Sequence, residues 1–403
     1  MSLNYNPKRS KFTNFNKVFF SLPAKLIFII LSVFLLGDFL PEYLKSLLLT
    51  TSLVMKEILL FVLPAIVFFL VFASFSQLSG GFMVFTGLLL ALVCISNFTA
   101  VMVAYPVGYF AQDFIVTNNI VQSSLELKPF YTLKLPKLCD NSTALVIGLL
   151  LGVYTSAKNN EPLKRFAKKG SYIANGFLAK CFTPLLPLFI LGFILKAQHD
   201  GLLAVLFRNF MPLLSVIILL YVFYIGTLYV VVNVFDLPKA LTSLKNILPA
   251  ALVGFSTMSS AAAMPVLING AIKNSEDEDV PRRIVPFITN THMIGDALAI
   301  PLMAMSLYIL EYNQFPSMDK YVLFAVAYML AKFASAGIPG GTILIMTPVL
   351  EAKLGFTSEM STIILTTYLL FDPFCTLGSV FGNGGFVMMF EKLKSRMTSE
   401  VVV

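Results

Sequence analysis

Long apolar stretches run through the first 235 residues of the chain, separated by shorter polar segments. A helix needs about 20 mostly apolar residues to cross a bilayer, so this pattern predicts a series of transmembrane helices. The sequence lacks the alternating runs that are typical of a transmembrane barrel. The apolar stretches fall at about 24–40, 45–78, 82–111, 143–156, 172–197 and 209–235.

After residue 235, small and polar residues interrupt the apolar stretches, as in GFSTMSSAAAMP at 254–265 and SAGIPGGT at 335–342. Such residues free backbone groups that lipid cannot satisfy, so these segments are expected to be buried in protein or to line a polar cavity. Both lie midway through apolar stretches of roughly 35 residues, which predicts helices that enter the membrane, turn and come back out. Paired broken segments indicate a solute site in a secondary transporter, whereas a channel filter would need repeated pore loops of one kind.

Composition supports a membrane protein. Hydrophobic residues make up 57% of the 403 residues and charged residues 12%, and the mean hydropathy is +0.83. Soluble domains are nearer about 45–50% apolar and about 25% charged. We therefore expect one integral membrane domain, with enough apolar sequence for roughly eight to ten spans.

The formal net charge is +8, from 29 basic and 21 acidic side chains. Basic residues of membrane proteins gather in cytoplasmic loops, so we assign this excess to orientation and not to nucleic-acid binding. Five basic and no acidic residues occur in the first 25 positions, which predicts a cytoplasmic N-terminus and a retained first helix instead of a cleaved signal peptide. Four crossings return the basic loop at 158–169 to the cytoplasm; we expect the C-terminus there too, in a plasma or bacterial inner membrane.

Catalytic and metal-binding motifs are missing from the sequence. Its four cysteines are scattered and it has two histidines, so a disulfide framework, a structural zinc site and a histidine-rich metal site are not expected. The sequence contains no nucleophile–base set and no phosphate-binding glycine loop, which argues against an enzyme. We expect no cofactor and no metal beyond a coupling sodium ion.

Four motifs follow one another along the chain: a Leu-Pro pair in an apolar stretch, a serine-rich turn, a glycine-rich turn and a polar pattern in the last apolar stretch. They are LLFVLPAIVFFLVFAS at 59–74, STMSSAAAMP at 256–265, SAGIPGGTILIMTPVLEAKLGF at 335–356, and Asp372–Pro373 with Gly378 and Asn383. In the order and spacing of these motifs the chain resembles the dicarboxylate/amino acid:cation symporter family, which comprises glutamate and neutral amino acid transporters. The resemblance covers nearly the whole chain and is weakest over 1–45 and 112–145.

The resemblance implies an all-α integral membrane fold of eight transmembrane helices plus two re-entrant helical hairpins, an inverted-repeat transporter of the elevator type. It also implies a homotrimer in which a mobile transport part moves against a fixed scaffold. The implied function is secondary active transport of a small carboxylate or amino-acid-like solute with sodium or proton coupling. The single transporter unit, 1–403, would contain scaffold helices at 1–81 and 143–208, transport helices at 82–111 and 209–396, hairpins at 240–275 and 320–357, a seventh helix at 284–312 and an eighth at 358–392.

The chain departs from the family's pattern at the residues that carry the chemistry. The family has NMDGT in the unwound middle of the seventh helix, where the asparagine and the aspartate coordinate sodium. Here His292, Ile294 and Asp296 replace the asparagine, the aspartate and the threonine, while the methionine and the glycine are kept. The sodium-binding carboxylate of this motif is therefore lost, and a new acidic residue stands two positions later.

The eighth helix departs in the same way. Where the family has an aspartate for the substrate's amino group, an arginine for its side-chain carboxylate and a later aspartate for sodium, this chain has Thr376, Ser379 and Val387. Of the four family residues on this helix, Asn383 alone is kept.

These losses constrain the solute. No arginine lies between Arg283 and Arg396, and Lys332 is the only cation near the tip in the first arm of the second hairpin. A second buried carboxylate needs a fixed cation, so acidic amino acids are disfavoured, and loss of the amino-group aspartate weakens the case for neutral amino acids. What remains is a main-chain cradle at the hairpin tips, whose amides suit one carboxylate or another small anion. The candidate substrate-binding residues are Ser259, Ser260, Asp296, Gly337, Ile338, Gly340, Thr376, Ser379 and Asn383.

The cation sites are altered as well. Among the family's three sodium sites, the one that could survive rests mostly on carbonyls beside the helix break and the second hairpin. His292 and Asp296 are spaced i, i+4 and share a face if the segment is helical; intramembrane ionisable groups mark ion pathways, so we expect coupling through this pair, by protons or at most one sodium ion. The candidate cation-binding residues are Ser96, Asn97, Thr291, His292, Met293, Asp296, Ser335, Ala336 and Asn383.

Structural interpretations of the same residues stay open. His292 could hydrogen-bond a carbonyl of the broken helix, and Asp372 could be a cap or a hydrogen-bonding residue at the start of the last helix segment. Small polar residues such as Ser96 also hold transmembrane helices together. Two other functions fit the sequence: an uncoupled exchanger or anion-conducting relative with degenerate sodium sites, and a receptor or scaffold that kept the fold. Gradient-dependent uptake into liposomes separates the first from a symporter, and bound ligand without flux would support the second.

Overall fold

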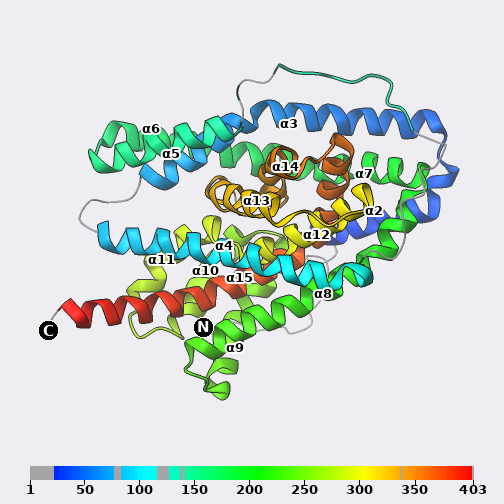
Figure 1. Ribbon diagram of the computed structural model, residues 1–403. Helices are drawn as coiled ribbons and strands as arrows, with labels where there is room; N and C mark the ends of the chain where they lie inside the picture. The colour runs from blue at the N-terminus through cyan, green and yellow to red at the C-terminus, as the bar shows by residue number, and fades with distance from the viewer. Residues whose placement is uncertain are drawn as a thin grey trace, which may run out of the picture.

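The computed structural model describes residues 22–76, 83–115, 127–136, 139, 141–335, 337 and 339–401, and these residues form helices without strands (Figure 1). The helices of the first half are α2 (Leu22–Leu36), α3 (Glu42–Ser76), α4 (Met83–Ile115), α5 (Asn141–Ala157), α6 (Glu161–Phe177), α7 (Thr183–His199) and α8 (Leu202–Val232). Those of the second half are α9 (Leu237–Thr257), α10 (Ser260–Ile272), α11 (Asp279–Thr291), α12 (Ile294–Tyr312), α13 (Met318–Ala331), α14 (Gly341–Leu354) and α15 (Ser358–Val401).

Among the described residues, six helical segments are long and apolar enough to cross a membrane: Glu42–Ser76, Gly87–Phe114, Glu161–His199, Met211–Val232, Asp279–Tyr312 and Ser358–Ser395. The all-helical architecture and these segments agree with an integral membrane protein. Helices α2 and α5, which the sequence predicts as further spans, have 15 and 17 described residues, fewer than the about 20 that span a bilayer core. The count of eight transmembrane helices therefore stays a prediction.

Helix α3 is the common packing partner in one group of helices, because α5, α6 and α7 all pack against it in the upper part of Figure 1. Small residues permit this close approach. A β-carbon added at Gly148 of α5 would lie 2.8 Å from the carbonyl oxygen of Phe68, and one at Gly152 would lie 2.5 Å from the β-carbon of Phe75. In lipid the hydrophobic effect does not drive helices together, so close packing of this kind stabilises their association.

The basic stretch at 158–169, predicted as a loop, is mostly helical because α6 begins at Glu161. The side chain of Asn160 accepts a hydrogen bond from the backbone N–H of Leu163 at 3.2 Å, and a proline stands in the first turn. Both features stabilise a helix start. A π-helical turn, Leu178–Phe182, joins α6 to α7, so the two run on as one long segment.

Helix α12 forms the centre of the second group and is buried from Ile294 to Tyr308. It packs against α4, α8 and α15. A helix that is apolar all round is expected in such an enclosed position. At its first turn a β-carbon on Gly295 would lie 2.0 Å from the carbonyl oxygen of Cys375 on α15, so the two backbones touch there and glycine is required.

Two helical hairpins occupy the segments for which the sequence predicts them. Helices α9 and α10 pack side by side after a reversal at Met258, whose φ of 53° is left-handed, and at Ser259, whose side chain caps α10. Helices α13 and α14 pack together across a tip that follows the short 3-10 turn Lys332–Ala334. Their depth in a bilayer stays a prediction.

The predicted seventh helix is two helices, α11 and α12, separated by a break at His292 and Met293. The backbone angles there are φ −114°, ψ 87° and φ −117°, ψ 77°, outside the helical region. Helix α15, in contrast, continues unbroken to Val401, beyond its predicted end at 392.

The two groups of helices also touch each other. Lys56 of α3 donates hydrogen bonds to the hydroxyl groups of Thr362 and Ser358 on α15, at 2.9 Å and 3.4 Å. The rings of Phe75 and Phe333 lie 5.1 Å apart between α3 and the second hairpin. The division into a fixed scaffold (1–81 and 143–208) and a mobile transport part (82–111 and 209–396) remains a prediction.

Candidate functional site

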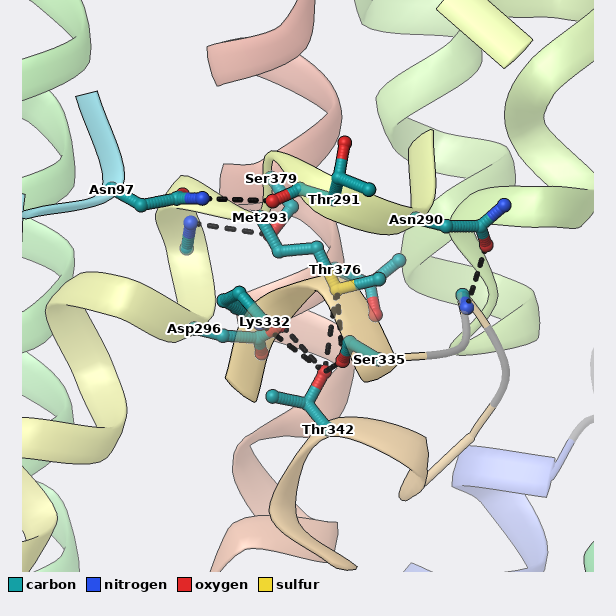
Figure 2. Close-up of polar contacts among 12 residues, drawn as sticks. Asn97, Asn290, Thr291, Met293, Asp296, Lys332, Ser335, Thr342, Thr376 and Ser379 are labelled. Atoms are coloured by element: carbon teal, nitrogen blue, oxygen red, sulfur yellow. Dashed lines mark hydrogen bonds and ion pairs between the residues drawn. The ribbon is translucent and has the colours of Figure 1, made fainter. Parts of the chain in front are cut away.

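A buried ion pair lies where the second hairpin meets the start of α12. The ammonium group of Lys332 is 3.0 Å from the Oδ2 atom of Asp296, and the two residues are 0% and 4% exposed. Figure 2 shows the pair between the ribbons of the two elements. Asp296 stands in the first turn of α12, where the partial positive charge of a helix N-terminus also stabilises a carboxylate.

Both oxygens of Asp296 have further donors. The Thr342 hydroxyl donates to Oδ2 at 2.9 Å, and the Tyr368 hydroxyl donates to Oδ1 at 2.7 Å. The carboxylate thus accepts three hydrogen bonds, including the one from Lys332. Buried charges are tolerated only when they are compensated in this way.

Hydroxyl groups and a thioether surround the pair. The Ser335 hydroxyl is 3.0 Å from that of Thr342, and both lie near the Met293 sulfur, at 3.8 Å and 3.3 Å. The ammonium of Lys332 is also 3.4 Å from the Thr342 hydroxyl. We call these residues the lysine cluster: Met293, Asp296, Lys332, Ser335 and Thr342. Three of the predicted cation-binding residues (Met293, Asp296 and Ser335) thus lie around a lysine.

A second carboxylate, Asp372 of α15, holds the tip of the second hairpin. Its Oδ2 atom accepts the backbone N–H of Gly340 at 2.8 Å, and its Oδ1 atom accepts the Thr376 hydroxyl at 3.2 Å. Tyr368 lies between the two acids, because its hydroxyl is also 3.3 Å from Asp372. Asp372 is not a helix cap, since α15 is continuous there; it is a hydrogen-bonding residue that links α15 to the hairpin.

A second cluster surrounds the helix break. The Nδ1 atom of His292 is 2.7 Å from the Asn383 side-chain oxygen, and its Nε2 atom is 2.9 Å from the Ser96 hydroxyl. Asn97 donates to the carbonyl oxygen of Thr291 at 2.7 Å. These five residues, Ser96, Asn97, Thr291, His292 and Asn383, form the histidine cluster. The side-chain partners of His292 are thus an amide and a hydroxyl, not a carbonyl of the broken helix.

His292 and Asp296 do not share a helix face. The i, i+4 rule applies within a continuous helix, and the backbone breaks at His292 and Met293. The condition for a common face, a helical segment, is therefore not met, and the two side chains contact different clusters. Within the described part of the chain, two buried atoms of the histidine cluster have no hydrogen-bond partner: the side-chain oxygen of Asn97 and the side-chain nitrogen of Asn383.

The two hairpin tips bind each other. The Ser259 hydroxyl donates to the carbonyl oxygen of Gly337 at 2.7 Å, and the backbone N–H of Ala261 donates to the same oxygen at 3.1 Å. The Gly337 N–H donates to the Asn290 side chain of α11 at 3.0 Å (Figure 2). Two predicted cradle amides, those of Gly337 and Gly340, therefore have partners within the protein, as they would in a closed conformation.

The remaining candidate residues serve different contacts. Ser260 is buried in the first turn of α10, and the Ser379 hydroxyl accepts the backbone N–H of Gly295 at 3.1 Å, which joins α15 to α12. Ile338 and Ala336 lie outside the described residues. Sequence reasoning missed four residues with structural roles at the site. They are Asn290, Thr342, Tyr368 and Lys332, the last of which was not recognised as the partner of Asp296. The signal available for each was a polar residue within an apolar stretch.

The architecture of paired hairpins that meet at a helix break in an apolar, helical chain defines an integral membrane protein of the transporter class. The sequence profile of the Sodium:dicarboxylate symporter family matches residues 22–393. The chain therefore belongs to this family, which the sequence motifs had indicated. It is a family of symporters and not of enzymes.

Two relatives match a part of the chain. Excitatory amino acid transporter 5 of Homo sapiens is 25% identical over 142 residues, which cover 35% of this chain and 25% of that protein. Neutral amino acid transporter B(0) of Oryctolagus cuniculus is 30% identical over 146 residues, 34% of this chain and 26% of that protein. The matches thus span about a quarter of the length of each relative.

Proposed function

We propose that the chain is a secondary active transporter that moves a small carboxylate or amino-acid-like solute, coupled to a cation, by an elevator-type movement of its hairpins and α4, α8–α12 and α15. The observation that carries this proposal is the junction of two hairpin tips beside a broken helix, built on buried polar groups. Transporters place solute sites at such junctions because unwound backbone is tolerated there. The names of the two relatives support an amino-acid-like solute.

The charges at the site narrow the solute class. The chain has no arginine between Arg283 and Arg396, and Lys332 is already paired with Asp296. A side-chain carboxylate of a solute would therefore find no arginine in this stretch, and at the site it would meet a lysine that is already paired, at a cost of several kcal/mol. A solute with a single carboxylate, bound by main-chain amides released when the tips separate, fits better than an acidic amino acid.

The solute-binding residues that we propose are those of the hairpin tips and the facing part of α15. Ser259 and Gly337 would release their mutual hydrogen bond, and Gly340 would release Asp372. Thr376 then presents a hydroxyl to the space between the tips and α15. Sodium or a proton is the proposed coupling ion; a homotrimer, a plasma or bacterial inner membrane and cytoplasmic termini complete the proposal.

Transport into proteoliposomes tests the proposal. A thermal-shift screen of small carboxylates and amino acids first identifies a solute, because a ligand stabilises the state that binds it. Uptake of that solute is then measured under imposed sodium and proton gradients for the wild type, Asp296→Asn and His292→Ala. Asp319→Asn, an exposed acid at the start of α13, is the matched control. Gradient-driven accumulation that the control keeps and the site variants lose is the expected result.

Two outcomes would contradict this function. A folded protein that binds a solute but shows neither uptake nor exchange would be a receptor. Uptake that responds to neither gradient, in the wild type and in both site variants alike, would make the chain an uncoupled exchanger, the alternative with degenerate cation sites.

A further inference from the structure

Lys332 has an unusual position for a lysine of a membrane protein. It lies at the end of the first arm of the second hairpin and is 0% exposed, although lysines near membrane interfaces ordinarily extend to water. Ionisable groups inside a membrane are expensive and mark functional positions. The position therefore requires a reason beyond packing.

The groups around Lys332 are those that bind a small hard cation. The Asp296 carboxylate and the hydroxyls of Thr342 and Ser335 converge from three elements, and hard monovalent and divalent cations prefer such oxygen ligands. Within the described part of the chain, no three His, Cys, Asp or Glu side chains gather in a way that could hold a metal ion, so this cluster has the charge for a monovalent cation and not for a multivalent one. The ammonium of Lys332 already makes contacts with two of these ligands, at 3.0 Å and 3.4 Å.

We propose that the ammonium of Lys332 is a built-in cation that takes the place of a sodium ion in the lysine cluster, so that the chain reaches its closed conformation without sodium. This inference rests on the proposed function and specifies its ion coupling: of the two proposed coupling ions, sodium and the proton, it leaves the proton. Sodium fits poorly beside Lys332. Two unit positive charges about 4 Å apart, at an effective dielectric constant of about 20, weaken sodium binding on the order of a thousandfold.

The geometry also explains why the lysine lies on the hairpin and its partner on another element. An ion that diffuses in would link the second hairpin to α12 only while it is bound. A lysine attached to the hairpin links them whenever the tip is closed, and opening the tip separates two buried charges. Closure of the tip therefore depends on the protein's own charge and not on the sodium concentration.

Removing the ammonium should create a sodium site. In Lys332→Met the carboxylate of Asp296 keeps the hydroxyls of Thr342 and Tyr368 but loses its counter-charge. Sodium can then supply it. Lys320→Met, an exposed lysine in the first turn of the same arm, is the matched control, and Lys332→Met/Asp296→Asn is the charge-neutral control.

The test uses the purified 403-residue chain and sodium alone, without a solute, so it does not depend on transport. Thermal unfolding is followed while sodium chloride replaces choline chloride at constant ionic strength. We expect a saturable sodium-dependent rise of the unfolding temperature in Lys332→Met and none in the wild type, the Lys320→Met control or the double variant. Lithium and potassium titrations give the selectivity of the created site.

A saturable response of the wild type to sodium overturns the inference, and so does a Lys332→Met variant that folds but ignores sodium. If Lys332→Met cannot be purified in choline chloride, its purification is repeated in sodium chloride, and the result of that purification tests the inference. Rescue by sodium supports the built-in cation, and failure in both salts while the double variant folds contradicts it. If the wild type shows no solute uptake, the proposed function is contradicted. The sodium titrations of the wild type and the variants, and what they say about Lys332, stay unchanged.

Discussion

Replacing Lys332 by methionine and Asp296 by asparagine, singly and together, measures how strongly the two buried charges depend on each other. Each single change leaves one charge without its partner 3.0 Å away, at side chains that are 0% and 5% exposed. Removal of one partner of a buried pair costs about 3–5 kcal/mol, whereas replacement of both is often near neutral. If the two effects were additive, the double variant would be destabilised by at least about 6 kcal/mol. We expect a destabilisation of at most about 3 kcal/mol, which corresponds to a coupling energy of at least about 3 kcal/mol between the two side chains.

The surroundings also predict which single change costs more. Without the ammonium, the carboxylate of Asp296 keeps two hydroxyl donors, those of Thr342 and Tyr368. Without the carboxylate, Lys332 keeps the Thr342 hydroxyl at 3.4 Å and the face of the Tyr328 ring, 5.7 Å from its nitrogen. Asp296→Asn should therefore destabilise the protein more than Lys332→Met does.

The assay is equilibrium unfolding in mixed micelles by increasing amounts of a denaturing detergent, in choline salts. The exposed pair Arg282–Glu278, with a similar separation of 3.1 Å and side chains that are 56% and 66% exposed, is the matched control cycle. Its coupling should not exceed about 1 kcal/mol, because solvent screens such pairs. Equal couplings for the buried and the exposed pair would refute the view that burial strengthens the interaction between Lys332 and Asp296.

Further predictions concern packing, the hairpin tips and one exposed loop. Gly295→Ala places a β-carbon 2.0 Å from a carbonyl oxygen of α15 and should abolish monodisperse protein in size-exclusion chromatography, whereas Gly226→Ala, with open space around it, should not. Ser259→Ala removes the hydroxyl that donates to the Gly337 carbonyl and caps α10, so amide hydrogen exchange at the tip should accelerate on the order of tenfold; unchanged exchange would contradict the tip contact. The backbone N–H of Asp279 and the neighbouring Lys394 lower the pKa of Asp277 in the exposed loop before α11. The ionised Asp277 therefore stabilises this loop fully above its ordinary pKa of 3.8, and the stabilisation is lost as the pH falls through its lowered pKa. Asp277→Asn should remove that acid-dependent step from hydrogen exchange of the loop.

The helical architecture follows from the apolar pattern, because lipid leaves the backbone few alternatives. Glycine, serine and proline in the middle of apolar stretches mark the places where α9 gives way to α10 and α13 to α14. That these helix pairs are re-entrant stays a prediction. The basic stretch at 158–169 was misjudged because charge counting assigns a side of the membrane and not a backbone conformation. Asn160 and the proline after it were the local signal that a helix begins there.

Less of the site was predictable. The break at His292 was anticipated from the resemblance, yet the shared face with Asp296 assumed a helical period that the break cancels. The partner of Asp296 is 36 residues further along the chain, and nothing local distinguishes a lysine that pairs with an acid from one that reaches water. Asn290 was missed because a polar residue near a helix end is common, and only the tertiary fold brings a hairpin tip to it.

The contact between Lys56 and α15 has a consequence for movement between the two groups of helices. Its ammonium lies between hydroxyls one helical turn apart, 2.9 Å from Thr362 and 3.4 Å from Ser358. A slide of α15 along its own axis by about 5.4 Å, one turn, would move one of these two hydroxyls to the place of the other, so the ammonium would keep a hydroxyl partner. The lysine would then exchange one hydroxyl partner for another, so this contact would not have to be lost for the two groups of helices to move against each other.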